Sequence, residues 1–163
     1  MFGKRLLLAM LSAFILIQCA GGGAATSSRS GYKKSIGDYR RMDIMDKSKN
    51  LLGKYGFEIE REEDGTAGDI YIETRWKVRT PFDIEKTDNV MSARTKIIIR
   101  ARGTQRSVNM VEGERLFKAE FDTENEVMIQ GQNEWVKQPY SEELTAYLKK
   151  LHEELAGELR FTR

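Results

Sequence analysis

Residues 69–79 read DIYIETRWKVR and give the clearest indication of the fold class. Every second position carries an apolar residue or threonine: Ile70, Ile72, Thr74, Trp76 and Val78. The positions between them are polar or charged, apart from Tyr71. Because successive side chains of a β-strand point to opposite faces, this period of two predicts one strand with a buried face and a polar face.

Further strands are expected on both sides of this one. Residues 57–62 are predicted to form the preceding strand, and the turn-forming sequence EDGT at 63–66 separates the two. After a long polar connection over 81–92, residues 94–102 surround three consecutive isoleucines and predict another strand. The remaining segments are two short strands expected at 107–112 and 115–121, and a stretch at 122–138 whose apolar spacing fits neither period.

Helical patterns lie at both ends of this run of strands. Residues 38–55 predict a moderately amphipathic helix that ends at Gly56, and Ser141 is a typical N-cap for a second helix. The second helix carries one apolar stripe: Leu144, Tyr147, Leu148, Leu151, Leu155 and Leu159. The order of elements predicts an α+β fold, a two-layer sandwich in which an N-terminal and a C-terminal helix pack on one face of an antiparallel sheet of about four strands.

The N-terminus has the pattern of an export signal. Lys4 and Arg5 precede an apolar stretch over residues 6–17, which is shorter than the roughly twenty residues of a membrane-spanning helix. The sequence LIQC then ends at Cys19 and resembles the lipobox of bacterial lipoproteins, although Gln18 stands where that motif usually has a small residue. We therefore expect residues 1–18 to be a lipoprotein signal peptide and Cys19 to carry the lipid.

The composition agrees with export. Cys19 is the only cysteine, so lipid attachment would remove a thiol that has no disulfide partner. Without Lys4 and Arg5 the 27 basic residues become 25, which equals the 25 acidic residues, so the net charge gives no reason to expect a nucleic-acid partner. Residues 19–31 are rich in Gly, Ala and Ser and predict a flexible spacer, and residues 32–163 are long enough for a single domain. In the sorting pathway of such lipoproteins, Ala20 after the lipid cysteine implies the outer membrane, facing the periplasm.

The residues that usually carry catalysis are scarce. The chain has one His, His152, and its single cysteine is assigned to lipid, so a thiolate, a His cluster or a Cys/His pair is not expected. No Gly-rich phosphate loop is visible between a strand and a helix. The sequence therefore predicts no catalytic, metal or cofactor site, and a protein that is not an enzyme.

One group of residues predicts a binding surface. On the polar faces of the two clearest strands, six positive charges would converge if the helices cover the other face: Arg75, Lys77, Arg79, Lys96, Arg100 and Arg102. Such a patch would suit an anionic lipid, lipopolysaccharide or an acidic protein surface. The alternative is that Glu58, Glu60 and Glu62 on the neighbouring strand pair with these charges and neutralise them.

A lipobox, a Gly/Ser spacer and a helix–sheet–helix domain together resemble small outer-membrane lipoproteins such as the lipopolysaccharide-assembly lipoprotein. The resemblance covers the whole chain in architecture and rests on no diagnostic motif. It implies contact with an outer-membrane barrel protein and with lipopolysaccharide. Our first hypothesis is a non-enzymatic binding or assembly component, and the alternatives are an accessory subunit of another envelope complex or a small carboxylate enzyme acting on cell-wall glycan.

Overall fold

The structure is a computed structural model, and it describes residues 31–64, 69–104, 111 and 114–160. Its strands are β1 (Lys34–Arg40), β2 (Ile59–Asp64), β3 (Ile70–Thr74), β4 (Lys77–Arg79), β5 (Val90–Gly103), β6 (Leu116–Ile129) and β7 (Val136–Lys137). Its helices are α2 (Arg41–Lys54), α3 (Asp83–Thr87) and α4 (Glu142–Arg160). The predicted α+β fold is confirmed, but the described antiparallel sheet has seven strands rather than about four.

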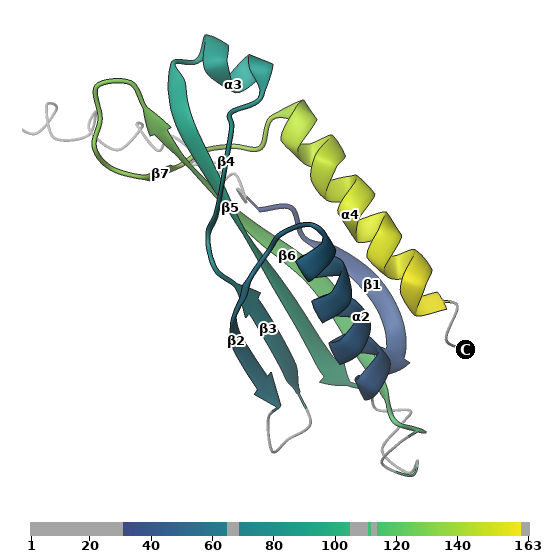
Figure 1. Cartoon of the computed structure of the whole chain (residues 1–163). Coiled ribbons are helices and arrows are strands. Elements are labelled where there is room, and N and C mark those ends of the chain that lie inside the picture. Colours follow the sequence, from purple (N-terminus) through teal and green to yellow (C-terminus); the bar gives the residue numbers. More distant parts are fainter. Residues whose placement is uncertain (1–30, 65–68, 105–110, 112–113, 161–163) are drawn as a thin grey trace, which may run out of the picture.

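The long strands β5 and β6 form the centre of the sheet. The strand order is β1-β6-β5-β3-β2, with β4 added to β5 and β7 added to β6 (Figure 1). Odd-numbered residues of β5 and β6 face each other in the register Ile99↔Phe121 and Ala101↔Ala119, and all four are almost fully buried. We call the side of the sheet that carries them the inner face, and the opposite side the outer face.

The N-terminal and C-terminal helices pack against the inner face, where Figure 1 shows them side by side. Leu51 and Leu52 of α2 and Leu151 and Leu155 of α4 belong to one core cluster with the inner residues of the sheet. Each such leucine stabilises the fold by about 1.5–3 kcal/mol through burial of apolar surface. The apolar stripe predicted for the last helix is the buried side of α4.

Two predicted helix ends are confirmed in atomic detail. Ser141 Oγ accepts a hydrogen bond from the Leu144 N–H at 3.1 Å, as an N-cap does. At the end of α2, Gly56 has a φ of +71°, and the Phe57 N–H donates to the Leu52 carbonyl at 2.9 Å. This is the Schellman arrangement, in which a residue without Cβ adopts the left-handed conformation at little cost.

The prediction of one strand over 69–79 is wrong in its second half. The pair Glu73↔Ile98 and the pair Lys77↔Thr95 are separated by three residues on one strand and two on β5. One extra residue therefore lies between β3 and β4, because residues 74–76 span the same stretch as Lys96 and Ile97 of β5. Because of such a bulge, each side chain that follows it points to the face of the sheet opposite to the one that the alternation predicts.

Three other segments also differ from the expectation. The first strand, β1, occupies part of the region expected to begin a helix, and it bends at Gly37, whose φ is +136° and where a Cβ would lie 2.9 Å from the Tyr39 ring. The connection over 81–92 contains α3 and the start of β5. The first part of the unclear stretch at 122–138 continues β6 as far as Ile129. Its pattern was unclear because the polar residues Thr123 and Asn125 occupy buried inner positions, where an alternating pattern would have apolar residues. The strand expected at 107–112 lies outside the described residues, apart from Val111.

Candidate binding surface

The outer face of the sheet is not covered by α2 or α4, and it carries most of the charged side chains of the two central strands. Even-numbered residues of β5 and β6 lie there, and basic residues of β5 mostly oppose acidic residues of β6. The pairs in register are Arg94↔Glu126, Lys96↔Glu124, Ile98↔Asp122, Arg100↔Glu120 and Arg102↔Lys118. Only the last of these five places two like charges opposite each other.

Most cations of the outer face are neutralised by neighbouring carboxylates. Arg94 bonds Glu126 at 2.5 Å, Lys96 bonds Glu73 at 2.5 Å, and Arg100 bonds Asp122 at 2.6 Å. The hydrogen bond from Lys96, together with one from Tyr71, lowers the pKa of Glu73 in spite of its partial burial. Cross-strand pairing therefore neutralises much of this face. The carboxylates come mainly from β3 and β6, and the strand at 57–62 contributes Glu60, which lies 3.9 Å from Lys96.

Tryptophan side chains cover one end of the outer face. The guanidinium of Arg94 lies 4.6 Å from the ring centre of Trp76 and 4.3 Å from that of Trp135. Such cation–π contacts stabilise the positive charge of the partly buried Arg94 guanidinium, which also pairs with Glu126. Trp76 was expected in the core, but the bulge places it on the outer face and half-buried.

At the opposite end of the outer face the cations outnumber the carboxylates. A hollow of about 350 Å³ is lined by Lys33, Arg100, Arg102, Lys118 and Glu120, and we call it the basic hollow. Lys33 bonds Glu120 at 2.9 Å, and this bond, with the charges of Lys118 and Arg102, lowers the pKa of Glu120. Asp122 pairs with Arg100, and Asp38 of β1 lies opposite Lys118 in the register.

The six basic residues predicted from the sequence do not lie on one surface. Lys96, Arg100 and Arg102 lie on the outer face as expected, and Arg75 is exposed at the bulge. The two residues after the bulge, Lys77 and Arg79, lie opposite Thr95 and Ala93, which are buried on the inner face. The expectation of a shared face is therefore wrong for Lys77 and Arg79, because the bulge shifts the alternation by one residue.

Lys77 and Arg79 have structural partners on the inner face. The Lys77 ammonium donates to the Tyr55 carbonyl at the end of α2 and lies 4.8 Å from the centre of the Phe57 ring. Arg79 donates to both carboxylate oxygens of Glu85, at 2.6 and 2.7 Å, and to Asn125 at 3.1 Å. Its contacts hold α3 against the sheet.

Two basic residues of the hollow, Lys33 and Lys118, were not predicted from the sequence. Lys118 could have been found, because the expected strand at 115–121 has apolar residues at 117, 119 and 121, and Lys118 between them must then lie on the other face. Lys33 gave no comparable signal, since the strand β1 that follows it was not predicted. The hollow therefore combines residues from three regions of the chain.

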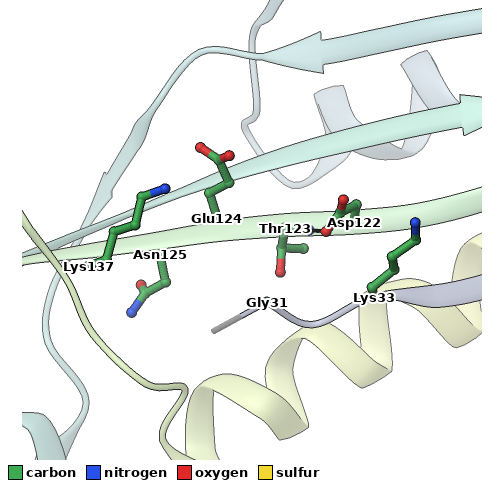
Figure 2. A pocket seen from close by; sticks show the side chains of 7 residues that line it. All are labelled: Gly31, Lys33, Asp122, Thr123, Glu124, Asn125 and Lys137. Carbon is green, nitrogen blue, oxygen red and sulfur yellow. Dashed lines mark hydrogen bonds between the residues drawn. The ribbon is translucent and has the colours of Figure 1, made fainter. Parts of the chain in front are cut away.

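A second hollow, of about 670 Å³, lies beside β6 between the segments of β6 that pair with β1 and β7 (Figure 2). It is lined by residues of mixed charge: Gly31, Lys33, Asp122, Thr123, Glu124, Asn125 and Lys137. Tyr140 donates its hydroxyl hydrogen to the Thr123 carbonyl at 2.8 Å, so part of this strand edge already has a partner. Among the residues that the structure describes, no three His, Cys, Asp or Glu side chains are grouped to hold a metal ion.

The carboxyl groups give no support to the hypothesis of a glycan-cleaving enzyme. Such an enzyme needs a general acid whose pKa is raised. Within the described ranges, every carboxyl with a clear departure has a lowered pKa: Glu73, Asp83, Glu85, Glu120 and Glu154.

Comparisons of this chain with protein-family models, with curated proteins and with solved structures find no match. The resemblance to lipopolysaccharide-assembly lipoproteins thus stays a prediction. Cys19, the signal peptide and most of the spacer lie outside the described residues. Within those residues, no helix has the length and apolar character needed to cross a membrane.

Proposed function

We propose that this chain is a non-enzymatic binding component of the bacterial envelope, anchored by a lipid on Cys19 at the periplasmic face of the outer membrane. Its basic hollow contacts phosphate groups of anionic lipid or lipopolysaccharide. The observation that carries the proposal is the arrangement of Lys33, Arg100, Arg102 and Lys118 around Glu120, which is the one carboxylate among the described residues that line the hollow. Lys33 and Arg100 already pair with Glu120 and Asp122, so a bound anion adds an acceptor mainly for Arg102 and Lys118.

The register of the sheet supports this use of the hollow. Like charges directly opposite each other on neighbouring strands destabilise a sheet, and Arg102 opposes Lys118 in this way. Both side chains are exposed, so they bind an anion without a large desolvation cost. A phosphate between them offsets their repulsion.

The expected lipid anchor places the hollow near the bilayer surface. The predicted spacer after Cys19 covers residues 20–31, and a flexible segment of about twelve residues spans roughly 20 Å. Lys33 of the hollow follows Gly31 by two residues. Basic side chains near an anionic membrane surface contribute about 1 kcal/mol each, so a cluster of this size strengthens a lipid anchor.

The test is binding of the mature chain, without its lipid, to vesicles of phosphatidylcholine with or without phosphatidylglycerol. The double variant Arg102→Glu/Lys118→Glu should weaken binding to the anionic vesicles by about tenfold or more. The matched control is Lys86→Glu/Lys150→Glu, which makes the same charge change on exposed positions of α3 and α4. Equal binding by a folded hollow variant and the unmodified chain would reject the proposal.

A partner protein is tested separately. The lipidated chain is purified from membranes in mild detergent, and the co-purifying proteins are identified by mass spectrometry. Recovery of an outer-membrane barrel protein would support the assembly role, and recovery of a different envelope complex would support the accessory-subunit alternative. Loss of that partner in the Arg102→Glu/Lys118→Glu variant would locate the contact at the basic hollow.

A further inference from the structure

A groove lies between the edge of the sheet and the C-terminal helix. β1 is the last strand on its side of the sheet and pairs with β6 alone among the described strands. α4 runs beside it, as Figure 1 shows, and the two enclose a groove of about 720 Å³. Its lining includes Tyr32, Lys34, Lys149, His152, Gly157 and Arg160.

The strand side of the groove offers backbone hydrogen-bonding groups. The outer edge of a terminal strand presents N–H and C=O groups that another extended chain can pair with. His152 already uses one of them, because its Nε2–H donates to the Ser35 carbonyl at 3.1 Å. This contact shows that the edge faces α4 at hydrogen-bonding distance and that one of its carbonyls accepts a hydrogen bond from the groove.

On the helix side, the groove is lined partly by residues with small side chains, which leave space next to α4. Apart from its neighbours in the helix, a Cβ atom added at Gly157 would meet no atom of the described residues within 4 Å, and Ala156 lies next to it. Glycine is costly in a helix interior, by about 1 kcal/mol relative to alanine. The missing side chain leaves room beside β1 for an extended backbone.

The charges of the groove are predominantly positive. Lys34 contributes from the strand, and Lys149 and Arg160 contribute from the helix. Glu153 is the one acidic residue among the described residues of the lining, and its carboxylate lies 3.8 Å from Lys149. An occupant with carboxylate side chains therefore complements this groove better than a neutral or basic one.

We propose that the groove binds an extended acidic segment of a partner protein, which adds to β1 as a further antiparallel or parallel strand. Main-chain hydrogen bonds to the edge of β1 supply affinity, as in other cases of strand addition. Alternate acidic side chains of the segment lie against Lys34, Lys149 and Arg160. This site is separate from the basic hollow, whose Arg102 and Lys118 project from the outer face.

The test uses two fluorescein-labelled peptides, EVEVEVE and KVKVKVK, titrated onto the mature chain and followed by fluorescence anisotropy. The acidic peptide should bind at micromolar to low millimolar concentration, and the basic peptide should bind at least about tenfold more weakly. Amide chemical shifts should change in β1 and along the Thr145–Arg160 flank of α4. The proposal is overturned if the peptides bind equally, if neither binds, or if the shifts change elsewhere.

A pair of glycine variants separates binding in the groove from general effects. Gly157→Leu fills the groove and should weaken the acidic peptide by about tenfold or more, whereas Gly53→Leu should not change its affinity. Gly53 lies in α2, and a Cβ there also meets no atom of the described residues within 4 Å outside its own helix, so both variants raise helix propensity at positions where a Cβ fits. Full binding by Gly157→Leu would contradict the proposal.

Charge variants locate the peptide on one surface or the other. Lys34→Glu/Arg160→Glu should weaken the acidic peptide by about tenfold, and Arg102→Glu on the outer face should leave its affinity unchanged. If Arg102→Glu removes binding and the groove variants do not, the peptide occupies the basic hollow and the groove proposal fails. That result would leave the vesicle experiment on the basic hollow unaffected.

Discussion

Arg79 and Arg102 are both arginines on strands of one sheet, but their surroundings differ in nearly every respect. Arg79 lies on the inner face, with its side chain 13% exposed, and bonds Glu85, Asn125 and Thr95. Arg102 lies exposed on the outer face, opposite the like charge of Lys118. The contrast shows that Arg79 stabilises the fold from the inner face of the sheet, whereas Arg102 is accessible to a partner on the outer face.

The inner surroundings explain why Arg79 cannot also bind a partner. The buried carboxylate of Glu85 bonds the Arg79 guanidinium and also accepts the Phe82 N–H at 2.8 Å, which begins α3. The guanidinium stacks 4.6 Å from the centre of the Phe82 ring. Most donors of Arg79 are thus used within the fold, and removal of either partner leaves the other charge buried without compensation.

The largest effect that we expect is the loss of stability in Arg79→Ala. The variant leaves Glu85 buried without its cation, which costs about 3–5 kcal/mol in the free energy of unfolding. Urea unfolding followed by circular dichroism measures this loss. The matched variant Arg102→Ala, in the same sheet, should change the free energy by less than about 0.5 kcal/mol. Equal losses in the two variants would show that the two sites do not differ as described.

A change of pH should break the same inner network reversibly. Burial alone would raise the pKa of Glu85, but the hydrogen bonds from Arg79 and from the Phe82 N–H outweigh it, and the pKa lies below its ordinary 4.5. The stabilisation is therefore fully present above about pH 4.5 and is lost as the pH falls through the folded-state pKa. Unfolding by urea between pH 7 and pH 3 should show this fall.

Other carboxyls with a lowered pKa also contribute to the loss of stability at acid pH. The variant Glu85→Gln therefore isolates the part of that loss that is due to Glu85. The variant should be less stable at neutral pH and should depend less on pH below about 4.5. In an Arg79→Ala background the substitution should have little further effect, because the two residues act as a pair. A parallel shift of the whole curve, with unchanged slope, would contradict this assignment.

The smallest expected effect concerns the bulge between β3 and β4, which places Arg79 on the inner face. Thr74 is fully buried at the end of β3, and its Oγ1 accepts the Ile97 N–H at 3.0 Å. Thr74→Val keeps the shape but leaves that N–H without an acceptor, and it should cost about 1–3 kcal/mol. Thr145→Val, on the half-buried flank of α4, is the control and should change stability by less than about 0.5 kcal/mol.

Hydrogen exchange gives a second measure of the same variant. If Thr74 fixes the bulge, amide exchange in Lys77 and Val78 of β4 should become faster in Thr74→Val. Exchange in α4 should change no more than the global stability requires. Unchanged stability together with unchanged exchange in β4 would show that the bulge is held by other contacts.

Much of the fold followed from local patterns. The α4 stripe, its Ser141 cap and the end of α2 at Gly56 were all predicted, because helix propensity and capping depend on residues a few positions apart. The alternation around Ile70 and Ile72 likewise predicted a half-buried strand correctly. Where polar residues occupy inner positions, as Thr123 and Asn125 do, the period disappeared and the second half of β6 was missed.

The candidate surface was predicted less well than the fold. Three of the six proposed basic residues lie on the outer face, whereas Lys77 and Arg79 belong to the inner face. The residues that complete the basic hollow, Lys33 and Lys118, come from segments distant in the sequence from Arg102. A surface that combines such segments depends on strand order and register, which no local pattern contains.

The sequence by itself determined the helix at the C-terminus, the antiparallel α+β class and the expectation of a lipid on Cys19, because each depends on the order and spacing of neighbouring residues. The tertiary structure alone decided which charges share a face. One extra residue between β3 and β4 places Lys77 and Arg79 on the inner face instead of the outer face. Separately, the pairing of β5 with β6 places Arg102 opposite Lys118. Both outcomes arise from hydrogen bonding between strands far apart in the chain, and for this reason only the folded sheet contains them.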